Sequence, residues 1–169
     1  ATEPKFKSKR NHRQTYRTWN VSIKQDQTKA WVNLPVVGSV LVRGLHGTYQ
    51  RLIGATVKRE PTGQYYIVLQ VQFDPEIRTN KGGRTGVDVG LGLYVVDSNG
   101  EAYENPQYFE KALKRLKRAQ RSLDRKQQDG KNWEKQRIRV ARLHAKIANQ
   151  RKDYLQKVTT DLIRENQTI

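Results

Sequence analysis

Cysteine is absent from the 169 residues, and acidic and apolar residues are scarce. Without cysteine the chain has no disulfide, no thiolate zinc site and no cysteine nucleophile, which agrees with a reducing cytosol. Asp and Glu number 16 against 33 Lys and Arg, so the formal net charge is +17. Because neutralising phosphates releases condensed counterions, this excess makes nucleic acid the leading partner. The apolar content of 35% indicates a thin core.

Long apolar runs are also missing. No stretch approaches the roughly 20 residues of a membrane span, and the first ten residues lack the apolar centre of a signal peptide. We therefore expect a soluble chain with no membrane partner. Its first residue is Ala rather than Met, which suggests processing or a chain cut from something longer. Phosphate-binding loops, nucleophile elbows and His-Glu-x-x-His motifs are absent as well.

The positive charge lies in two regions of the sequence. Residues 1–79 hold 13 basic and 5 acidic side chains, and residues 111–157 hold 17 and 4. Between them, residues 80–110 hold only 2 basic and 5 acidic side chains. This order suits a cation site set between two phosphate-binding surfaces.

The first basic region has a β pattern. Glu60-Pro61-Thr62-Gly63 forms a turn signal between two apolar runs and predicts a hairpin. The second run alternates, so that Ile67, Leu69, Val71 and Phe73 share one face. Short runs rich in β-favouring residues predict a small barrel or sandwich of roughly 75 residues. These runs are 15–21, 30–34, 39–45, 52–58 and 65–73.

The polar Pro- and Gly-bearing stretch 74–83 predicts a domain boundary. After it we expect strands at 85–89, 93–96 and from 102, with a turn at 98–100. Two helices are predicted, one from Phe109 and one from about Trp133 to Arg164, separated at Asp129-Gly130. They should pack as an antiparallel hairpin along apolar stripes. The stripes are Leu113, Leu116 and Leu123 in one helix, and Val140, Ile147, Tyr154, Val158 and Leu162 in the other.

Asp88 lies in the middle of an apolar strand pattern bordered by Gly86 and Gly90. Desolvating an unpaired carboxylate costs several kcal/mol, so a donor or cation should compensate it. One interpretation is a structural pair with a nearby Lys or Arg, and the other is a ligand for Mg²⁺ in phosphodiester hydrolysis. A single Asp does not complete such a site. The nearest other acids lie at or beyond the predicted turn, where we expect solvated side chains: Asp97, Glu101 and Glu104.

Several sequence segments from residue 86 onward form a specific pattern: Gly86-Val87-Asp88-Val89-Gly90-Leu91-Gly92-Leu93, Glu104-Asn105-Pro106 and the stretches 116–126, 143–155 and 164–169. Together they resemble the TnpB (OrfB) transposon proteins. Upstream, Phe6-Lys7-Ser8-Lys9-Arg10 and the β-rich stretch resemble the wedge domain of that family. The resemblance covers almost the whole chain.

The resemblance implies an α/β plus all-β fold: a wedge-like β-barrel piece at 1–79 and the N-terminal part of an RNase H-like (RuvC) domain at 84–169, with a basic helical insertion at 109–165. It implies an RNA-guided DNA endonuclease related to type V CRISPR effectors, with a transposon-derived guide RNA and target DNA as partners. The expected location is the bacterial or archaeal cytoplasm, with nucleoid association when the protein is bound to DNA.

In that family an Asp, Glu, Asp set holds catalytic Mg²⁺, and Asp88 matches the first acid. The other two acids and a cysteine zinc ribbon would follow Ile169, and part of the wedge domain would precede Ala1. We therefore expect an internal fragment or a truncated relative that binds nucleic acid without cutting it. The alternative is a non-catalytic RNA- or DNA-binding protein derived from the nuclease, and a less favoured one is a basic ribosome-associated structural protein.

Two sets of residues are predicted to contact nucleic acid. The first set lies near the N-terminus, where the alternative is a solvated basic arm without a ligand. The second lies on the helical hairpin, where the alternative is a solvated helix face. The first set combines cations with side chains that hydrogen-bond or stack: Lys5, Lys7, Lys9, Arg10, Arg13, Gln14, Thr15 and Tyr16. The second lies on the helical hairpin and should contact the backbone of a heteroduplex: Arg118, Arg121, Arg125, Arg137, Arg142 and Lys146.

Overall fold

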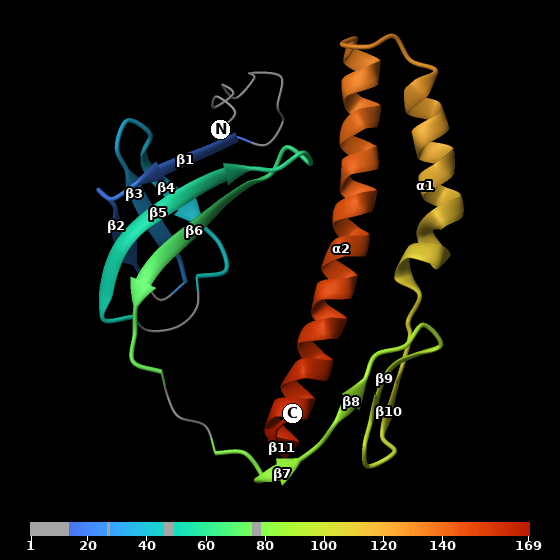
Figure 1. Cartoon of the computed structure of the whole chain (residues 1–169). Helices are drawn as coiled ribbons and strands as arrows, with labels where there is room; N and C mark the ends of the chain where they lie inside the picture. The colour runs from blue at the N-terminus through green and yellow to red at the C-terminus, as the bar shows by residue number, and fades with distance from the viewer. Residues whose placement is uncertain (1–13, 27, 46–48, 76–78) are drawn as a thin grey trace, which may run out of the picture. The chain divides into compact units, whose positions relative to one another are not determined.

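The chain divides into two compact units, Ala1–Glu76 (unit 1) and Ile77–Ile169 (unit 2), in the computed structural model. The structure describes residues 14–26, 28–45, 49–75 and 79–169. Unit 1 contains strands, whereas two long helices dominate unit 2 (Figure 1). The division falls between residues 76 and 77, within the stretch 74–83 where the sequence pattern predicts a domain boundary.

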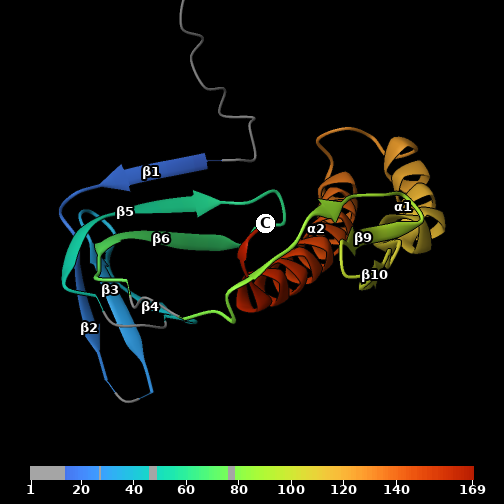
Figure 2. The ribbon, with the colours of Figure 1, turned by 60° about the horizontal axis from the view of Figure 1, so that its bottom comes forward.

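Unit 1 begins with an antiparallel sheet whose strand order is β1-β5-β6. The strands are β1 (Gln14–Thr18), β5 (Arg51–Arg59) and β6 (Tyr65–Gln72), and they lie side by side in Figures 1 and 2. The predicted hairpin joins β5 to β6. Its turn closes with Gly63 N donating to Glu60 O at 2.9 Å, and Gly63 has a φ of +82° that favours glycine.

A second antiparallel sheet has the order β2-β3-β4. Its strands are β2 (Ser22–Gln25), β3 (Ala30–Leu34) and β4 (Gly38–Val42). The sequence pattern predicts the last two strands but misses β2. Three of the four residues in β2 are polar, so the strand lacks the apolar alternation on which such predictions depend.

The core of unit 1 lies between these two sheets. Val32 and Leu34 of β3 are buried together with Ala55 of β5, and partly buried side chains from both sheets surround them. The predicted barrel is wrong in one respect, since no ladder joins the two sheets within the described residues and no closed barrel forms. Closure requires every strand to have two partners, and the six strands instead form two layers of three.

Unit 2 contains a small antiparallel sheet with the order β10-β9-β8. The strands are β8 (Val87–Asp88), β9 (Leu93–Asp97) and β10 (Ala102–Glu104). The turn predicted at 98–100 connects β9 to β10, with Gly100 at a φ of +84°. The first strand is shorter than predicted, because only two of its residues pair with β9.

A parallel pair links the start of unit 2 to its end. β7 (Gly83–Arg84) pairs with β11 (Asn166–Thr168), which directly follows the last helix. A Cβ at Gly83 would lie 2.8 Å from Asn166 Oδ1, so glycine permits the close approach of the two strands. Residues more than 80 positions apart form this pair, and no local pattern in the sequence indicates it.

The two predicted helices are α1 (Tyr108–Asp124) and α2 (Lys131–Glu165), which run antiparallel side by side (Figures 1 and 2). Leu116, Ala119 and Leu123 of α1 pack against Val140 of α2, with Trp133 and Leu143 beside them. The predicted hairpin is therefore confirmed. The sequence pattern predicts both ends of α2 to within two residues and the start of α1 to within one.

The second half of the α2 stripe has a different partner. Val158 and Leu162 pack against Val95 of β9, with Tyr103 and Tyr154 at the edge of the cluster. The reason is length, since α1 has 17 residues and α2 has 35, or about 25 Å and 52 Å of helix. The small sheet covers the part of α2 that α1 does not reach.

Candidate nucleic-acid interface

Helix α1 has one apolar side and one cationic side. Its buried residues are Leu116, Ala119 and Leu123, which face α2. The helix contains six Lys and Arg residues and two acidic residues, and all six basic side chains are exposed. The hydrophobic contacts therefore fix which side of α1 faces solvent, and that side is positively charged. The six cations are Lys111, Lys114, Arg115, Lys117, Arg118 and Arg121.

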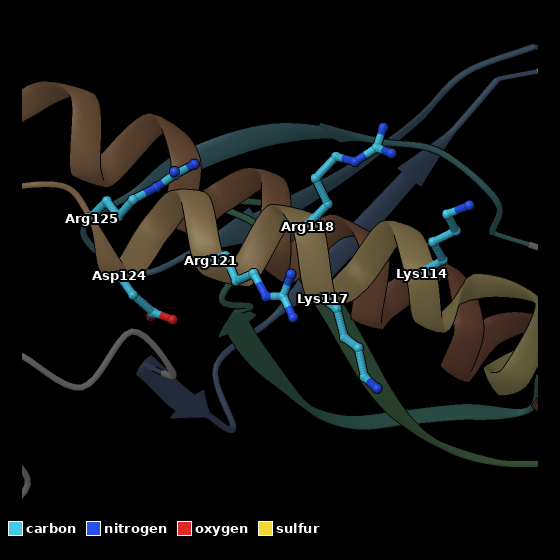
Figure 3. A pocket seen from close by; sticks show the side chains of 6 residues that line it. All are labelled: Lys114, Lys117, Arg118, Arg121, Asp124 and Arg125. Atoms are coloured by element: carbon cyan, nitrogen blue, oxygen red, sulfur yellow. The ribbon is translucent and has the colours of Figure 1, made fainter.

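Part of this cationic side is hollowed. A shallow hollow of about 710 Å³ is lined by Lys114, Lys117, Arg118, Arg121, Asp124 and Arg125. All six side chains project from α1 or from the residue that follows it (Figure 3). Asp124 is the only acid among them, and its Oδ1 accepts a hydrogen bond from Gln120 Nε2 at 3.0 Å.

A second hollow of about 590 Å³ lies between α1 and α2. α2 contributes Gln136 and Arg139, while the cations of α1 line the other side. Gln136 Nε2 donates to the backbone O of Ala119 at 2.9 Å, and this hydrogen bond joins the two helices within the lining of the hollow. Cations of both helices therefore line this hollow.

The structure brings together three of the six residues predicted on the hairpin. Arg118, Arg121 and Arg125 line the same hollow (Figure 3). Arg142 and Lys146 are exposed on α2 but line neither of the two hollows. Their contacts with nucleic acid stay a prediction.

Arg137 lies in a different environment from the other predicted residues. Its side chain is mostly buried, and its guanidinium donates to both carboxylate oxygens of Glu134, at 2.6 and 2.7 Å. These hydrogen bonds raise the pKa of Arg137. A bidentate pair of this kind holds the side chain against its own helix.

Sequence reasoning missed five cations that line the two hollows. Helical spacing could have found them, since residues three and four positions apart share a face. The apolar stripe of α1 identifies the buried side, and each exposed cation on the opposite side is then a candidate. The missed residues are Lys111, Lys114, Arg115, Lys117 and Arg139.

The other predicted set belongs to the beginning of unit 1. Gln14, Thr15 and Tyr16 lie in β1, where all three are exposed. The five cations of this set lie outside the described residues: Lys5, Lys7, Lys9, Arg10 and Arg13.

Asp88 lies at the end of β8, where it pairs with Val96 of β9. Its side chain is exposed, so the desolvation expected from the apolar pattern is wrong. β8 is an edge strand, and its flanking residues Val87 and Val89 are exposed as well. An exposed carboxylate on an edge strand is accessible to a ligand, and the metal-binding role stays a prediction.

Asp97 is buried, which corrects the expectation of a solvated turn residue. Its Oδ1 accepts hydrogen bonds from the backbone N of Asn99 at 2.9 Å and of Glu101 at 2.7 Å. The side-chain amide of Asn99 donates to Oδ2 at 3.2 Å. These donors compensate the desolvation of the carboxylate, so Asp97 shapes the β9–β10 turn. Glu101 and Glu104 are exposed, as predicted.

A third hollow, of about 350 Å³, has four acids and two basic residues in its lining. These residues are Asp97, Glu101, Asp161 and Glu165, together with Lys81 and Arg84. Burial and the charges of these acids together raise the pKa of Tyr103, which lies in the same hollow. Among residues 14–26, 28–45, 49–75 and 79–169, no three Asp, Glu, His or Cys side chains are grouped to hold a metal ion.

None of the described helices is both long enough and apolar enough to cross a bilayer.

The family model OrfB_IS605, described as a probable transposase, matches residues 66–169. The "Putative RNA-guided DNA endonuclease InsQ" of Escherichia coli (strain K12) is 34% identical over 161 residues, which cover 95% of this chain and 39% of that protein. A "Putative RNA-guided DNA endonuclease" of Streptomyces pristinaespiralis is 36% identical over 114 residues, covering 68% of this chain and 28% of that protein. The chain therefore spans less than two fifths of either relative.

Proposed function

Because this chain belongs to the OrfB_IS605 family of probable transposases, we propose that it is the nucleic-acid-binding part of an RNA-guided DNA endonuclease. In this proposal the cationic side of α1 contacts the phosphate backbone of guide RNA paired with target DNA. Family membership agrees with the resemblance found in the sequence. The names of the two relatives support the activity, and the charge of the chain supports the partner.

One observation carries the proposal: the cations of α1 are gathered on the side opposite its buried stripe. Arg118, Arg121 and Arg125 follow each other at intervals of three and four residues, so they lie along one line of the helix. A solvated helix face would usually mix both signs of charge, whereas Asp124 is the only acid in this hollow. Such a line of cations neutralises successive phosphates of a polynucleotide.

The contacts should be to backbone and shape rather than to base identity. Long cationic side chains that project from one helix are suited to phosphates, which lie on the outside of a duplex. In RNA-guided systems base pairing reads the sequence, and the protein holds the heteroduplex through its backbone. Scrambled heteroduplexes of equal length should therefore bind equally well.

The test is the salt dependence of heteroduplex binding by the 169-residue chain. Replacing Arg118, Arg121 and Arg125 by Ala should flatten the slope of log K against log salt by about 2 to 3 units, since each lost phosphate contact removes about 0.9. A variant with Lys131, Arg151 and Lys152 replaced by Ala has the same net charge and serves as the control, because these exposed residues of α2 line neither hollow. Equal slopes for the two variants would contradict the assignment to α1.

We further propose that Asp88 is one ligand of a catalytic Mg²⁺ ion. Mg²⁺ takes oxygen ligands and keeps several waters, and the exposed carboxylate of Asp88 fits that preference. When bound, the ion would activate water and stabilise the leaving oxygen in phosphodiester hydrolysis. Asp88 alone holds such an ion weakly, so we expect the 169-residue chain to bind nucleic acid without cutting it.

Two readouts test Asp88. In the chain itself, paramagnetic Mn²⁺ should broaden the NMR signals of residues 87–89, and Asp88→Asn should abolish the broadening. In a chimera that carries this chain in place of the matching segment of the E. coli relative, Asp88→Ala should abolish cleavage and leave RNA binding nearly intact. Glu101→Ala is the control, because Glu101 is an exposed acid in the turn that precedes β10. Robust cleavage by the Asp88→Ala chimera would refute the role of Asp88. Guide-directed cleavage by the 169-residue chain alone would contradict the expectation that this chain does not cut.

A further inference from the structure

The sheet β1-β5-β6 has two unlike faces. One face is turned to the core, where Thr18 and Ala55 are buried and lie opposite each other. On the other face the register forms cross-strand rows of exposed or half-buried side chains. The middle row is Arg17, Thr56 and Val68; the row on one side contains Gly54 and Gln70, and the row on the other contains Thr15, Lys58 and Tyr66.

This outer face has a one-sided charge. The three strands together contain four Lys and Arg residues and no Asp or Glu. Of the four cations, Arg17 and Lys58 belong to the outer rows just described. A sheet face of this composition attracts anions, and no carboxylate in its strands competes for the two cations.

Trp19 marks one end of the face. It directly follows β1, and 62% of its surface is exposed. The guanidinium of Arg17 lies 4.2 Å from the centre of the Trp19 ring, and Arg17 also donates to Gln70 Oε1 at 2.8 Å. A Cβ at Gly54 would lie only 3.0 Å from Trp19 Cε3. Close contact with Gly54 and a guanidinium over the ring therefore hold the indole of Trp19 in position, while most of its surface remains in solvent.

Tyr66 marks the other end. Its side chain is 48% exposed, and it shares a row with Lys58. Four residues of strand separate the Trp19–Gly54 end from the Tyr66–Lys58 row, or about 13 Å. The face thus has an exposed aromatic ring at each end, with Arg17 in the row between them and Lys58 in the row of Tyr66. Sheets that bind unpaired nucleotides have the same components: aromatic side chains that stack on bases and a positive surface that follows the backbone.

We propose that this face binds single-stranded nucleic acid, with unpaired bases stacked on Trp19 and Tyr66 and phosphates held by Arg17 and Lys58. The proposal rests on the proposed function, since it assigns a second and chemically different nucleic-acid site to the same chain. Bases in a duplex are already stacked on each other, so exposed rings select unpaired ones. The ligand chemistry is common to RNA and DNA, and the two are separated by the experiment.

The experiment measures the affinity of the full 169-residue chain for fluorescently labelled twelve-nucleotide oligo(U) and oligo(dT), at a salt concentration that suppresses purely electrostatic binding. Trp19→Ala and Tyr66→Ala should each weaken binding on the order of 10- to 100-fold, as the loss of one base–aromatic stack does. Tyr65→Ala is the matched control. Tyr65 is exposed on the same strand, but the alternation directs it to the opposite face, and its replacement should change affinity less than about twofold.

Trp19→Phe keeps an aromatic ring and should recover most of the affinity lost in Trp19→Ala, which distinguishes stacking from a general disturbance of the sheet. The oligonucleotide that shows the larger loss with Trp19→Ala identifies the favoured sugar. The proposal is overturned if Trp19→Ala and Tyr66→Ala bind both oligonucleotides like Tyr65→Ala, or if Trp19→Phe is as weak as Trp19→Ala.

The failure of this proposal can be told apart from failure of the proposed function. If Trp19 and Tyr66 prove neutral while the triple Ala variant of α1 still flattens the salt slope for heteroduplex, only the sheet site is refuted. If the α1 variant also behaves like its control, the assignment of nucleic-acid binding to α1 fails separately.

Discussion

The outer face of the sheet β1-β5-β6 and the cationic side of α1 are both positively charged, yet they differ in what else they present. The hollow on α1 is lined by five cations, one acid and no aromatic residue. The sheet face places Trp19 and Tyr66 among two cations and several uncharged polar side chains. The first surface is suited to phosphates alone, and the second to phosphates and bases.

The difference separates two energetic terms. Binding to a line of cations is driven by counterion release and weakens steeply with salt. Stacking on aromatic rings depends much less on salt, because it does not require charge neutralisation. A basic chain can therefore combine a surface for paired nucleic acid with a surface for unpaired nucleic acid.

The largest effect on the difference between the two surfaces is expected from Gly54→Ala. The new Cβ would lie 2.9 Å from the backbone O of Thr18 and 3.0 Å from Trp19 Cε3. We expect a loss of about 1 to 3 kcal/mol in the free energy of unfolding of unit 1, as overpacking costs. Displacement of Trp19 should also weaken oligonucleotide binding, whereas heteroduplex binding by α1 should persist. Thermal denaturation and the two binding assays measure these effects.

Gly86→Ala is the control for this substitution. A Cβ at Gly86 meets nothing within 4 Å, and its φ is not in the left-handed region, so stability and binding should be nearly unchanged. A Gly54→Ala variant that melts and binds like Gly86→Ala would show that the position of Trp19 does not depend on Gly54.

A smaller effect is expected from Tyr154→Phe, which changes a residue of unit 2 and leaves the sheet face of unit 1 as it is. Tyr154 donates its hydroxyl to the backbone O of Glu104 at 2.5 Å and thereby ties α2 to β10. Its ring also packs edge-on against Tyr94, with centroids 5.4 Å apart. Loss of the hydrogen bond should lower the free energy of unfolding by about 1 kcal/mol at pH 7. Oligonucleotide binding by the sheet face should not change.

The same variant tests a pH dependence. Burial is the main cause that raises the pKa of Tyr154 above its ordinary value of 10.0, and electrostatic interactions with Tyr108 and Glu104 raise it further. The folded state therefore favours the neutral phenol, and this contribution to stability is complete below pH 10 and lost as the pH rises through the folded-state pKa. Chemical denaturation at pH 9 and pH 11 should show a smaller decrease for Tyr154→Phe than for the wild type. Identical decreases would mean that Tyr154 does not contribute.

Local patterns in the sequence predict most of the secondary structure. Helix ends follow from the apolar stripe and from Gly130, which forms the N-cap of α2. The β5–β6 hairpin follows from the Pro-Thr-Gly turn. These features depend on residues close together in the chain, so the sequence contains enough information to locate them.

Features that depend on distant residues could not be predicted in this way. The pairing of β7 with β11 joins positions more than 80 residues apart, and the division of the α2 stripe depends on the relative lengths of two helices. Asp97 has the composition of a solvated turn residue, but three donors within its own turn allow it to be buried. Barrel closure likewise depends on ladders between strands that no local motif encodes.

The candidate sites show the same limit. Charge runs identify α1 as basic, but only the buried stripe shows which cations share a surface. Arg137 illustrates the point. The charge of its segment predicts a contact with nucleic acid, but its guanidinium forms an ion pair with Glu134, three residues earlier in the same helix. Trp19 and Tyr66 are more than 40 residues apart in sequence, and only the register of β1, β5 and β6 brings them to one face.

The most direct measurement determines how variants of each surface bind each of the two ligands. The wild-type chain, the Trp19→Ala/Tyr66→Ala double variant and the Arg118→Ala/Arg121→Ala/Arg125→Ala triple variant are each titrated with single-stranded oligonucleotide and with heteroduplex over a range of salt concentrations. The double variant should lose affinity for the single strand and keep the salt slope for heteroduplex. The triple variant should flatten that slope by about 2 to 3 units and keep most of its affinity for the single strand at high salt. Loss of both ligands in the same proportion by both variants would contradict the assignment of two separate nucleic-acid surfaces.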